Sequence, residues 1–254
     1  MFFNIQFTFH IFGMIFSDSR DMKLYLFIPF FVLGTFVFSQ KTNYTKPSKS
    51  VGTVSNGSLI NAYRFQYKTR DYKYFSRLSY HILGRANVHS DVYAITIEAL
   101  KNSRTFSKDH RWRLMECSKR KGGRMFPHHT HQNGTSIDFM TPMLRKGKSY
   151  RLTNGLGVFH YLLKYTPSGS WGIRRKVKVD FDLMAQFILE LDKVARLHGM
   201  KIKKVILRTN LKDEFYATKH GDLVKKKGIY LVMSLPKIVN EQHDEHFHVD
   251  FEWL

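Results

Sequence analysis

The stretch HFHVDFEW at residues 246–253 alternates polar and apolar side chains at every position. A period of two is typical of a β-strand that packs one face against a core and turns the other face away from it. The apolar side chains then face the core, and the imidazoles of His246 and His248 share the opposite face. The stretch therefore predicts a half-buried strand that holds two histidines on one rigid surface.

A second histidine-rich stretch, HHTHQNGTSIDF, occupies residues 128–139. Six of the chain's 13 histidines lie at positions 128–131 and 243–248, a clustering that favours a metal site over scattered surface histidines. Residues 135–139 can alternate as the C-terminal strand does, which places Asp138 on the polar face. Imidazole and carboxylate are ligands that zinc takes in catalytic sites, where three protein ligands leave a fourth position for water. We therefore expect a zinc hydrolase.

The spacing of these residues excludes the commoner zinc peptidase motifs. The chain has neither His-Glu-x-x-His nor the inverted His-x-x-Glu-His, so the helix-borne site of those families is absent. It does have His131-x6-Asp138 and, about a hundred residues later, His246-x-His248.

This pair of motifs resembles that of the LAS metallopeptidases, the group of lysostaphin-like, D-alanyl-D-alanine and hedgehog-like domains. More narrowly, HxxHQxG at residues 128–134 and HxxHFHV at residues 243–249 resemble the penicillin-insensitive murein endopeptidases. The resemblance covers approximately residues 48–254. Four short segments outside the motifs also fit that family: residues 50–52, 56–57, 88–89 and 122–124.

The resemblance implies that His131, Asp138 and His248 are the ligands of a Zn²⁺ ion. One departure concerns the position two residues before the ligand aspartate, where the family often has a second carboxylate and this chain has Ser136. Ser136 is not among the implied ligands. The departure therefore bears on turnover or substrate preference and leaves the zinc assignment in place.

Three further histidines are implied to be catalytic. His246 would stand beside the metal, where an imidazole with a pKa near the working pH can take a proton from water and return it to the leaving amine. His128 and His243 would orient the site or donate a hydrogen bond to the tetrahedral oxyanion. The motifs do not say which of the two does which.

The function that the resemblance implies is that of an exported zinc-dependent endopeptidase, which cleaves the peptide cross-links of murein at a D-alanyl amide bond. Two alternatives stay open. One is a zinc amidase or another LAS-type wall hydrolase acting on a different amide, such as the lactyl–L-alanine bond. The other is a non-catalytic module that binds zinc or the cell wall.

The N-terminal part of the chain predicts export. Residues 24–38 form an uncharged apolar run that Met22-Lys23 precedes and Ser39-Gln40 follows. This run is short for a membrane span and typical of a signal-peptide core. We expect a signal peptide at residues 1–39, with Met22 as an alternative start and a retained anchor as the alternative interpretation. The expected location is periplasmic or otherwise extracytoplasmic.

The net charge of the chain indicates which kind of partner to expect. The formal net charge is +21, and a strongly basic chain commonly binds a polyanion. Because export directs this charge to the cell wall, we expect murein as the partner, no nucleic acid, and at most peripheral association with the envelope. A basic secreted nuclease is a remoter alternative.

The chain has a single cysteine, Cys117, which excludes an internal disulfide. We expect Cys117 to be a small buried residue, and a catalytic nucleophile is the alternative.

The periodicity of the remaining chain predicts an α+β domain at residues 51–254, preceded by an extended lead-in at residues 40–50. A small antiparallel sheet with flanking helices fits the pattern best. Residues 91–102 are expected to form a helix capped by Ser90 or Asp91, and residues 180–198 a second helix capped by Asp180 or Asp182 and ended by Gly199. The remaining expected elements are a strand end at residues 112–117, a strand at residues 204–208 and a segment at residues 235–241 that leads into the final strand.

Six other histidines lack partners at metal-ligand spacing, and we expect them to be solvated residues without a role at the site. They are His81, His110, His129, His160, His198 and His220.

Overall fold

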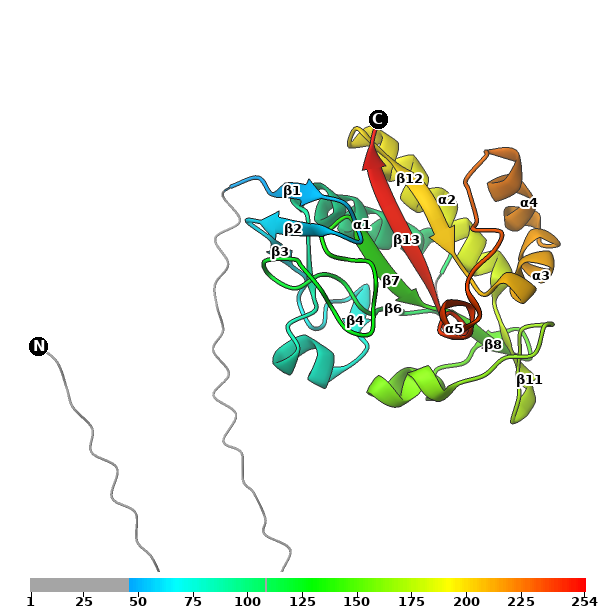
Figure 1. The fold of residues 1–254 in the computed structure, drawn as a ribbon. Helices are drawn as coiled ribbons and strands as arrows, with labels where there is room; N and C mark the ends of the chain where they lie inside the picture. The colour runs from blue at the N-terminus through cyan, green and yellow to red at the C-terminus, as the bar shows by residue number, and fades with distance from the viewer. Residues whose placement is uncertain (1–45, 108) are drawn as a thin grey trace, which may run out of the picture. The chain divides into compact units, whose positions relative to one another are not determined.

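The two histidine-bearing segments form neighbouring strands of one five-stranded sheet in the computed structural model (Figure 1). The order of the sheet is β12 (Met200–Ile206), β13 (His246–Trp253), β7 (Ser136–Met140), β6 (Trp112–Leu114) and β4 (Tyr72–Tyr74). Neighbouring strands are antiparallel, except that β4 and β6 run parallel. The predicted α+β class is confirmed, and the predicted antiparallel sheet has one parallel pair at its edge.

The structure describes residues 46–107 and 109–254, which lie within the unit Lys41–Leu254. The predicted signal peptide and residues 40–45 of the predicted lead-in lie outside the described residues. Within the described part of the chain, no helix has both the length and the apolar character needed to cross a bilayer.

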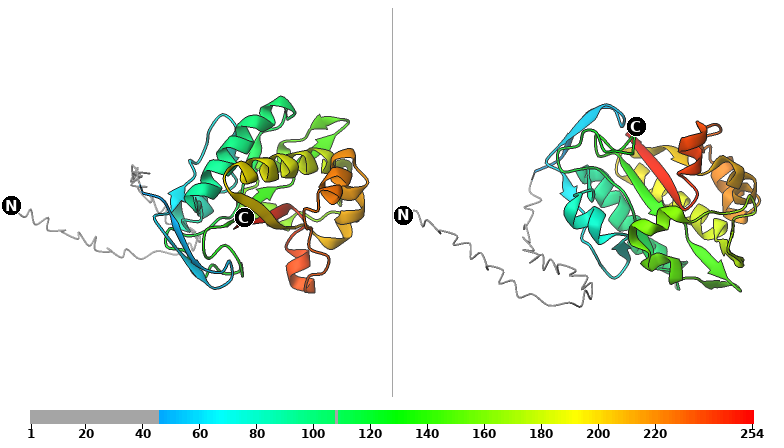
Figure 2. Two further views of the ribbon diagram at one scale, coloured as in Figure 1. Left: turned by 90° about the horizontal axis from the view of Figure 1, so that it is seen from above. Right: turned by 60° about the horizontal axis from the view of Figure 1, so that its bottom comes forward.

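The helices α1 (Ser90–Asn102) and α2 (Phe181–Leu197) pack over one face of the central sheet (Figures 1 and 2). Phe187 of α2 stacks on Trp112, with ring centroids 3.9 Å apart, and meets Phe139 edge to face at 5.1 Å. Phe139 in turn stacks on Phe247 across β7 and β13 at 5.3 Å. The apolar side chains of β13 therefore face the helices, as their alternation predicts.

Both predicted helices are present. Asp180 caps α2 as predicted, because its Oδ1 accepts a hydrogen bond of 3.1 Å from the N–H of Leu183, and Gly199 follows the helix with φ +71°. The predicted cap of α1 is wrong. The Nδ1 of His89 accepts the N–H of Asp91 at 3.2 Å, so an imidazole takes the role expected of Ser90 or Asp91.

The predicted bounds of one strand differ from the structure. The strand expected at residues 204–208 is β12, which begins at Met200 and ends at Ile206; a bulge between Ile202 and Lys204 absorbs the adjacent lysines that interrupt its period of two. The segment at residues 235–241, expected to lead into the final strand, contains the short helix α5 (Lys237–Glu241), and strand β1 begins at Lys49.

The other elements form smaller sheets and short helices around the central sheet. Two of the small sheets have two strands each: β1 (Lys49–Gly52) pairs with β2 (Gly57–Ile60), and β3 (Tyr63–Arg64) pairs with β5 (Asn87–Val88). A four-stranded sheet has the order β10 (Ser170–Trp171), β11 (Arg174–Val179), β8 (Met143–Arg145) and β9 (Lys148–Ser149). The remaining helical segments are η1 (Leu78–Ile82), η2 (Ser103–Thr105), η3 (Leu152–Gly155), η4 (Gly157–Leu162), η5 (Thr209–Leu211), α3 (Lys212–Tyr216) and α4 (Lys219–Lys226).

Gly122 ties the first histidine-rich loop to β2. Its φ is +70°, and a Cβ at this position would lie 2.1 Å from the carbonyl oxygen of Gln132 and 2.7 Å from the backbone nitrogen of Leu59. Only glycine permits this approach of three backbone segments. Gly123 has a similar φ of +77°, but a Cβ there would meet nothing within 4 Å.

We expect Gly122→Ala to lower the free energy of unfolding by about 2–5 kcal/mol, the sum of a left-handed alanine and a forced backbone shift. Gly123→Ala is the matched control, because it carries the left-handed cost alone, about 1–2 kcal/mol. Urea denaturation of both variants gives the comparison. Equal destabilisation would show that the close approach at Gly122 contributes nothing.

Candidate metal centre

The face of the sheet away from α1 and α2 carries a buried cluster of ionisable side chains. The register of β13 on β7 sets His248 directly opposite Asp138, and His246 opposite Met140. His246 is 2% exposed, and His248 and Asp138 are each 1% exposed. The prediction that this strand is half-buried is therefore wrong, because loops and η4 cover its polar face as well.

The loop before β7 brings His131 to this cluster in an unusual backbone conformation. Its φ is +68°, in the left-handed region that costs a non-glycine residue about 1–3 kcal/mol. The following residue is held on both sides, since the N–H of Gln132 donates to the carbonyl of Val54 and its own carbonyl accepts from Gly123, both at 2.9 Å. The surrounding backbone thus fixes His131 in its strained position.

Three side chains of this cluster have the arrangement of a metal site. His128, His131 and Asp138 each offer one ligand atom, and these atoms lie within 4.8 Å of one another. The Nε2 of His131 is 3.2 Å from the Oδ2 of Asp138, and the rings of His128 and His131 meet edge to face at 5.5 Å. Two imidazoles and one carboxylate form a donor set that suits Zn²⁺.

Unsatisfied polar atoms in the cluster also fit a cation. Within the described residues, the Nδ1 of His131 and the Oδ2 of Asp138 are buried and make no hydrogen bond, although this Oδ2 lies 3.2 Å from the Nε2 of His131. Buried polar atoms in folded proteins are nearly always hydrogen-bonded, so such exceptions require an explanation. A metal ion coordinated by the carboxylate would satisfy this oxygen of Asp138.

His248 contacts Asp138 from the neighbouring strand. Its Nδ1 donates to the Oδ1 of Asp138 at 2.7 Å, and its Nε2 donates to the Oδ1 of Asp250 at 2.6 Å. Ser136 donates its hydroxyl proton to the same carboxylate of Asp250. The serine at the position where the resembled family often has a carboxylate therefore helps to hold the acceptor of His248.

The charges of this group are coupled. Burial raises the pKa of Asp138, but His131, His246 and His248 outweigh it and hold the pKa well below its usual range. Burial lowers the pKa of His248, but the carboxylates of Asp250 and Asp138 outweigh it and raise that pKa to about 10. At neutral pH the cluster therefore contains an ionised Asp138, which is the protonation state that a metal ligand needs.

His246 lies two residues before His248 on β13, on the same face of the strand. Its Nδ1 donates to the Oε1 of Glu245 at 2.8 Å, and its Nε2 lies 3.8 Å from the Oδ2 of Asp138. Burial lowers the pKa of His246, but Glu245 and Asp138 outweigh it, so the net shift is upward. The ring thus has a fixed orientation with its second nitrogen towards the candidate ligands.

The other two predicted catalytic histidines are neutral at neutral pH. The pKa of His128 and that of His243 are both lowered to about 3. Burial is the largest cause in each case, and the second is the charge of a neighbouring histidine, His131 for His128 and His246 for His243. The Nδ1 of His243 donates to the carbonyl of Val239 at 2.6 Å, and its ring lies 4.8 Å from that of His246. Since a neutral imidazole carries one proton, the Nε2 of His243 is an acceptor.

All six residues singled out by the motifs therefore belong to one chain of contacts, but their grouping differs from the expected one. The described residues bring His128 together with His131 and Asp138, whereas His248 is hydrogen-bonded to two carboxylates. The assignment of His248 as the third ligand stays a prediction. The same holds for the catalytic roles of His128, His243 and His246.

Two residues of η4 at this cluster were not predicted from sequence. His160, expected to be solvated, is fully buried, and its Nε2 donates to the backbone carbonyl of Glu245 at 3.1 Å. Tyr161 meets the ring of His246 edge to face at 6.0 Å, and its buried hydroxyl makes no hydrogen bond to any residue that the structure describes. No spacing in the sequence links η4 to either histidine motif, whereas the alternation of β13 could have identified Asp250.

The remaining histidines of the described chain lie outside this cluster. His198 lies 2.9 Å from Glu98, His220 lies 2.9 Å from Asp182, and His129 is exposed, as expected. His110 is an exception to the prediction, because burial beside Trp112 lowers its pKa to about 4. Cys117 is a free, buried thiol, as expected.

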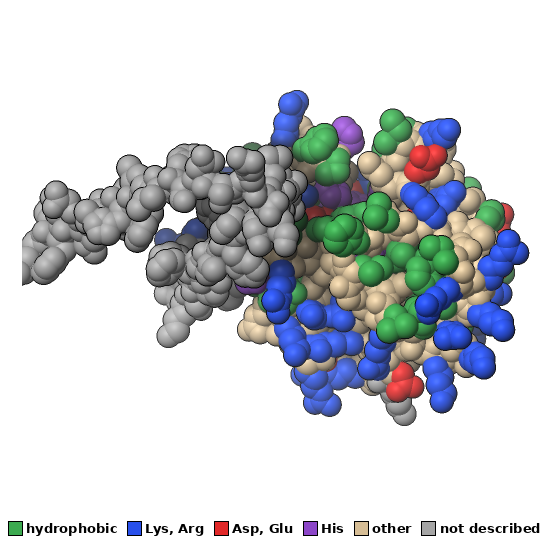
Figure 3. Space-filling model, turned by 90° about the horizontal axis from the view of Figure 1, so that it is seen from below, with side chains coloured by type: hydrophobic (Ala, Val, Ile, Leu, Met, Phe, Trp, Pro, Cys, Tyr) green, Lys and Arg blue, Asp and Glu red, His purple; other side chains and the backbone are tan. Residues whose placement is uncertain are grey.

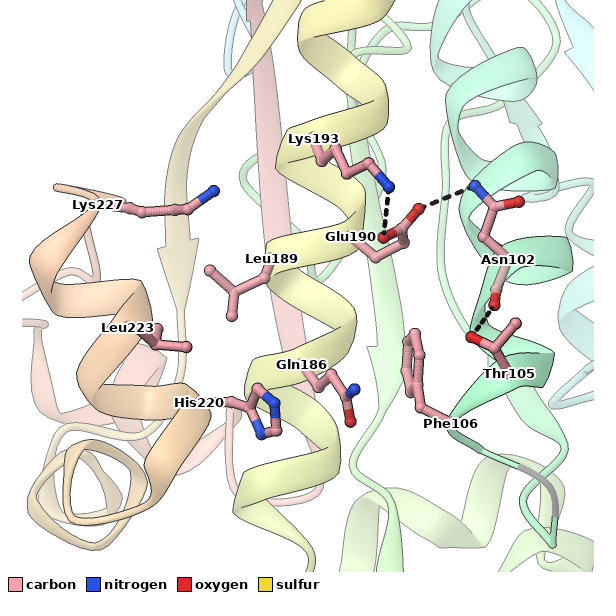
Figure 4. Close-up of a pocket in the computed structure, with 10 residues that line it drawn as sticks. All are labelled: Asn102, Thr105, Phe106, Gln186, Leu189, Glu190, Lys193, His220, Leu223 and Lys227. Carbon is pink, nitrogen blue, oxygen red and sulfur yellow. Dashed lines mark hydrogen bonds and ion pairs between the residues drawn. The ribbon is translucent and has the colours of Figure 1, made fainter.

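A separate groove of about 570 Å³ lies between α1, α2 and α4 (Figure 4). It is on the helix side of the sheet, away from the histidine cluster. Its acidic side chain, Glu190, accepts a hydrogen bond of 2.8 Å from Asn102 and pairs with Lys193 at 3.5 Å. The one carboxylate that lines this groove is therefore already paired, and Lys227 is the second lysine of the lining.

We expect His131→Ala and Asp138→Ala to abolish stoichiometric zinc binding, because both residues belong to the observed group and to the ligand set implied by the motifs. Zinc content after dialysis, measured by mass spectrometry, checks this. Comparing His248→Ala with His128→Ala decides the third ligand: the motifs predict loss in the first and retention in the second. His129→Ala is the control. Full zinc occupancy of both His131→Ala and Asp138→Ala would reject the site.

No protein-family model and no curated protein matches the chain. The structure itself shows an α+β domain with a group of three residues, His128, His131 and Asp138, that could hold a metal ion.

Proposed function

We propose that this protein is an exported zinc-dependent endopeptidase that cleaves the peptide cross-links of murein at a D-alanyl amide bond, on a LAS-type fold. The observation that supports the proposal most is the convergence of both histidine motifs, about a hundred residues apart in sequence, on Asp138. The substrate comes from the resemblance of the motifs. Export comes from the predicted signal peptide at residues 1–39.

The donor set of the cluster is suited to hydrolysis. A bound zinc ion would lower the pKa of a coordinated water to about 7 and polarise the scissile carbonyl. The site itself is shielded from bulk solvent, since the side chains of His131 and Asp138 are each 1% exposed. Electrostatic interactions with a developing charge are stronger in such an environment than in water.

His246 is the proposed general base and acid. The hydrogen bond from its Nδ1 to Glu245 fixes the ring, so that its Nε2 faces the carboxylate of Asp138 and can exchange a proton with a reacting group there. Glu245 also compensates the positive charge that the ring gains when it takes a proton.

The hydrogen bonds favour different roles for the two remaining histidines. Because the Nδ1 of His243 donates to Val239, its Nε2 can accept a hydrogen bond from a substrate N–H but cannot donate one to an oxyanion while neutral. Tyr161 offers a buried hydroxyl beside His246 that has no hydrogen-bond partner in the described part of the chain, so it is the better proposed donor to the carbonyl oxygen. His128 then belongs to the metal group or orients it.

Digestion of purified murein tests the reaction class. New D-alanyl carboxyl termini support the proposed endopeptidase, whereas free glycan strands would support the amidase alternative. No product from the zinc-loaded protein would support a non-catalytic binding module. Product identification by mass spectrometry distinguishes the three outcomes.

The activity should depend on metal and be indifferent to β-lactams, because the proposed nucleophile is a water and not a serine. Chelation should abolish murein cleavage, added zinc should restore it, and penicillin at concentrations that saturate serine transpeptidases should leave the rate unchanged. Product release from labelled murein measures all three. Cleavage that survives thorough chelation and stops with penicillin would contradict the mechanism.

His246→Ala should retain most of its zinc and lose activity by a factor on the order of 10²–10⁴, the usual range for a general acid–base residue. The exposed His129→Ala is the matched control and should keep the wild-type rate. Rates on labelled murein and zinc content are measured on the same preparations. Near-normal activity, or complete loss of zinc, would show that His246 has another role.

A further inference from the structure

One continuous part of the chain carries positive charge and contains no acidic residue of its own, although its Lys164 pairs with Asp244 outside it at 3.3 Å. Residues 141–179, called here the basic segment, contain nine Lys and Arg residues and no Asp or Glu, although the whole chain has 20 acidic residues. All nine cationic residues are exposed: Arg145, Lys146, Lys148, Arg151, Lys164, Arg174, Arg175, Lys176 and Lys178. The segment forms β8 to β11 together with η3 and η4.

The same segment exposes large apolar side chains. Leu152 is 70% exposed, Phe159 66%, Leu162 73% and Ile173 85%, and Leu156 is also exposed. In Figure 3, which views the molecule from below, hydrophobic side chains gather on one face beside many Lys and Arg side chains. Isolated exposed apolar residues are normal, but a group of this size within a cationic surface indicates an interaction site.

This exposure is built into the fold. The opposite side of η4 is anchored in the candidate metal centre, where His160 is fully buried and Tyr161 lies against His246. Leu163, directly after η4, is 5% exposed. With these residues held inside, Phe159 and Leu162 are directed outward.

The combination of charge and apolar surface identifies the kind of partner. A soluble polyanion would pair with the cations but would gain nothing from Phe159 or Leu162. A second copy of the chain would bring two predominantly cationic surfaces together, which like-charge repulsion opposes. The surface of a bilayer that contains anionic lipid accommodates both features, because its headgroups attract Lys and Arg while apolar side chains enter the interface.

We propose that the basic segment docks this protein on the surface of an anionic phospholipid bilayer. Phe159 and Leu162 enter the interfacial layer, and the cations of the β10–β11 hairpin, among them Arg174 and Arg175, contact the headgroups. The docking is peripheral, and it stands independently of the proposed hydrolase function. Because η4 contributes to both surfaces, the docked protein holds its candidate metal centre close to the membrane.

Vesicle co-sedimentation with the full chain tests this proposal. The vesicles contain either equal parts of phosphatidylglycerol and phosphatidylcholine or phosphatidylcholine alone, at low salt. We expect binding to the anionic vesicles only. The double variant Phe159→Ser/Leu162→Ser should weaken binding by roughly tenfold or more. The triple variant Arg174→Gln/Arg175→Gln/Lys176→Gln should weaken it by roughly 100-fold, at about fivefold per cation.

Matched control variants change the same residue types elsewhere. Leu197→Ser alters a side chain that is 72% exposed at the end of α2, and Lys225→Gln/Lys226→Gln/Lys227→Gln removes three exposed cations around the end of α4. Both should bind anionic vesicles as the unaltered protein does. Thermal unfolding of every variant confirms that it is folded.

Four outcomes would overturn the proposal. Equal binding to both vesicle types would show that charge has no role. Unchanged binding by both the double and the triple variant would place the membrane affinity in another part of the chain, for example residues 24–38. An effect of the cation variant without any effect of Phe159→Ser/Leu162→Ser would indicate a soluble polyanion as partner. A dimer in light scattering that this apolar variant dissociates would identify the occupant as a second copy.

Discussion

The pairing of β13 with β7 in a single register is the constraint on which the rest of the structure depends. It sets His248 opposite Asp138 on one face and Phe247 opposite Phe139 on the other. A slip of one residue would turn every side chain of the strand to the other face. The ionisable groups would then lie against Phe187 and the aromatic core, where an unpaired charge is very costly. The aromatic stack on the helix side therefore fixes the geometry of the histidine cluster on the other.

The cluster itself contributes little to the stability that holds it in place. Burying charged groups costs desolvation energy that their mutual attraction only roughly offsets, and His131 adds backbone strain. Residues at which a fold accepts both buried charge and strain are the expected location of function, because nothing in packing alone would favour them. The stabilising side of the balance lies in the core, where Phe187, Trp112 and Phe139 are almost completely buried.

The sequence predicted those parts of the molecule in which a local period survives in the fold. The alternation in β13 and β7 and the helical period of α2 lead to the right elements and to the right polar face. Tertiary contacts decide the rest. His89 caps α1 only because the chain before the helix places its imidazole over the first turn, and η4 reaches the cluster through a path that no spacing encodes. The polar face of β13 is buried because η4 and loops cover it, which the sequence does not reveal either.

The environment of His248 is compatible with the ligand set implied by the motifs, even though the group that could hold a metal ion contains His128 instead. Metal-bound histidines usually donate their other ring N–H to a carboxylate, and the Nε2 of His248 donates to Asp250 in this way. Ser136 and Lys204 hold that carboxylate, with the Nζ of Lys204 at 3.2 Å. The remaining nitrogen, Nδ1, faces the Oδ1 of Asp138 at 2.7 Å, so two lone-pair atoms meet unless a positive charge lies between them. A proton on His248 satisfies this requirement in the absence of metal. A zinc ion bound by both residues would satisfy it as well, with an adjustment of the two side chains and without any change in the register of β13.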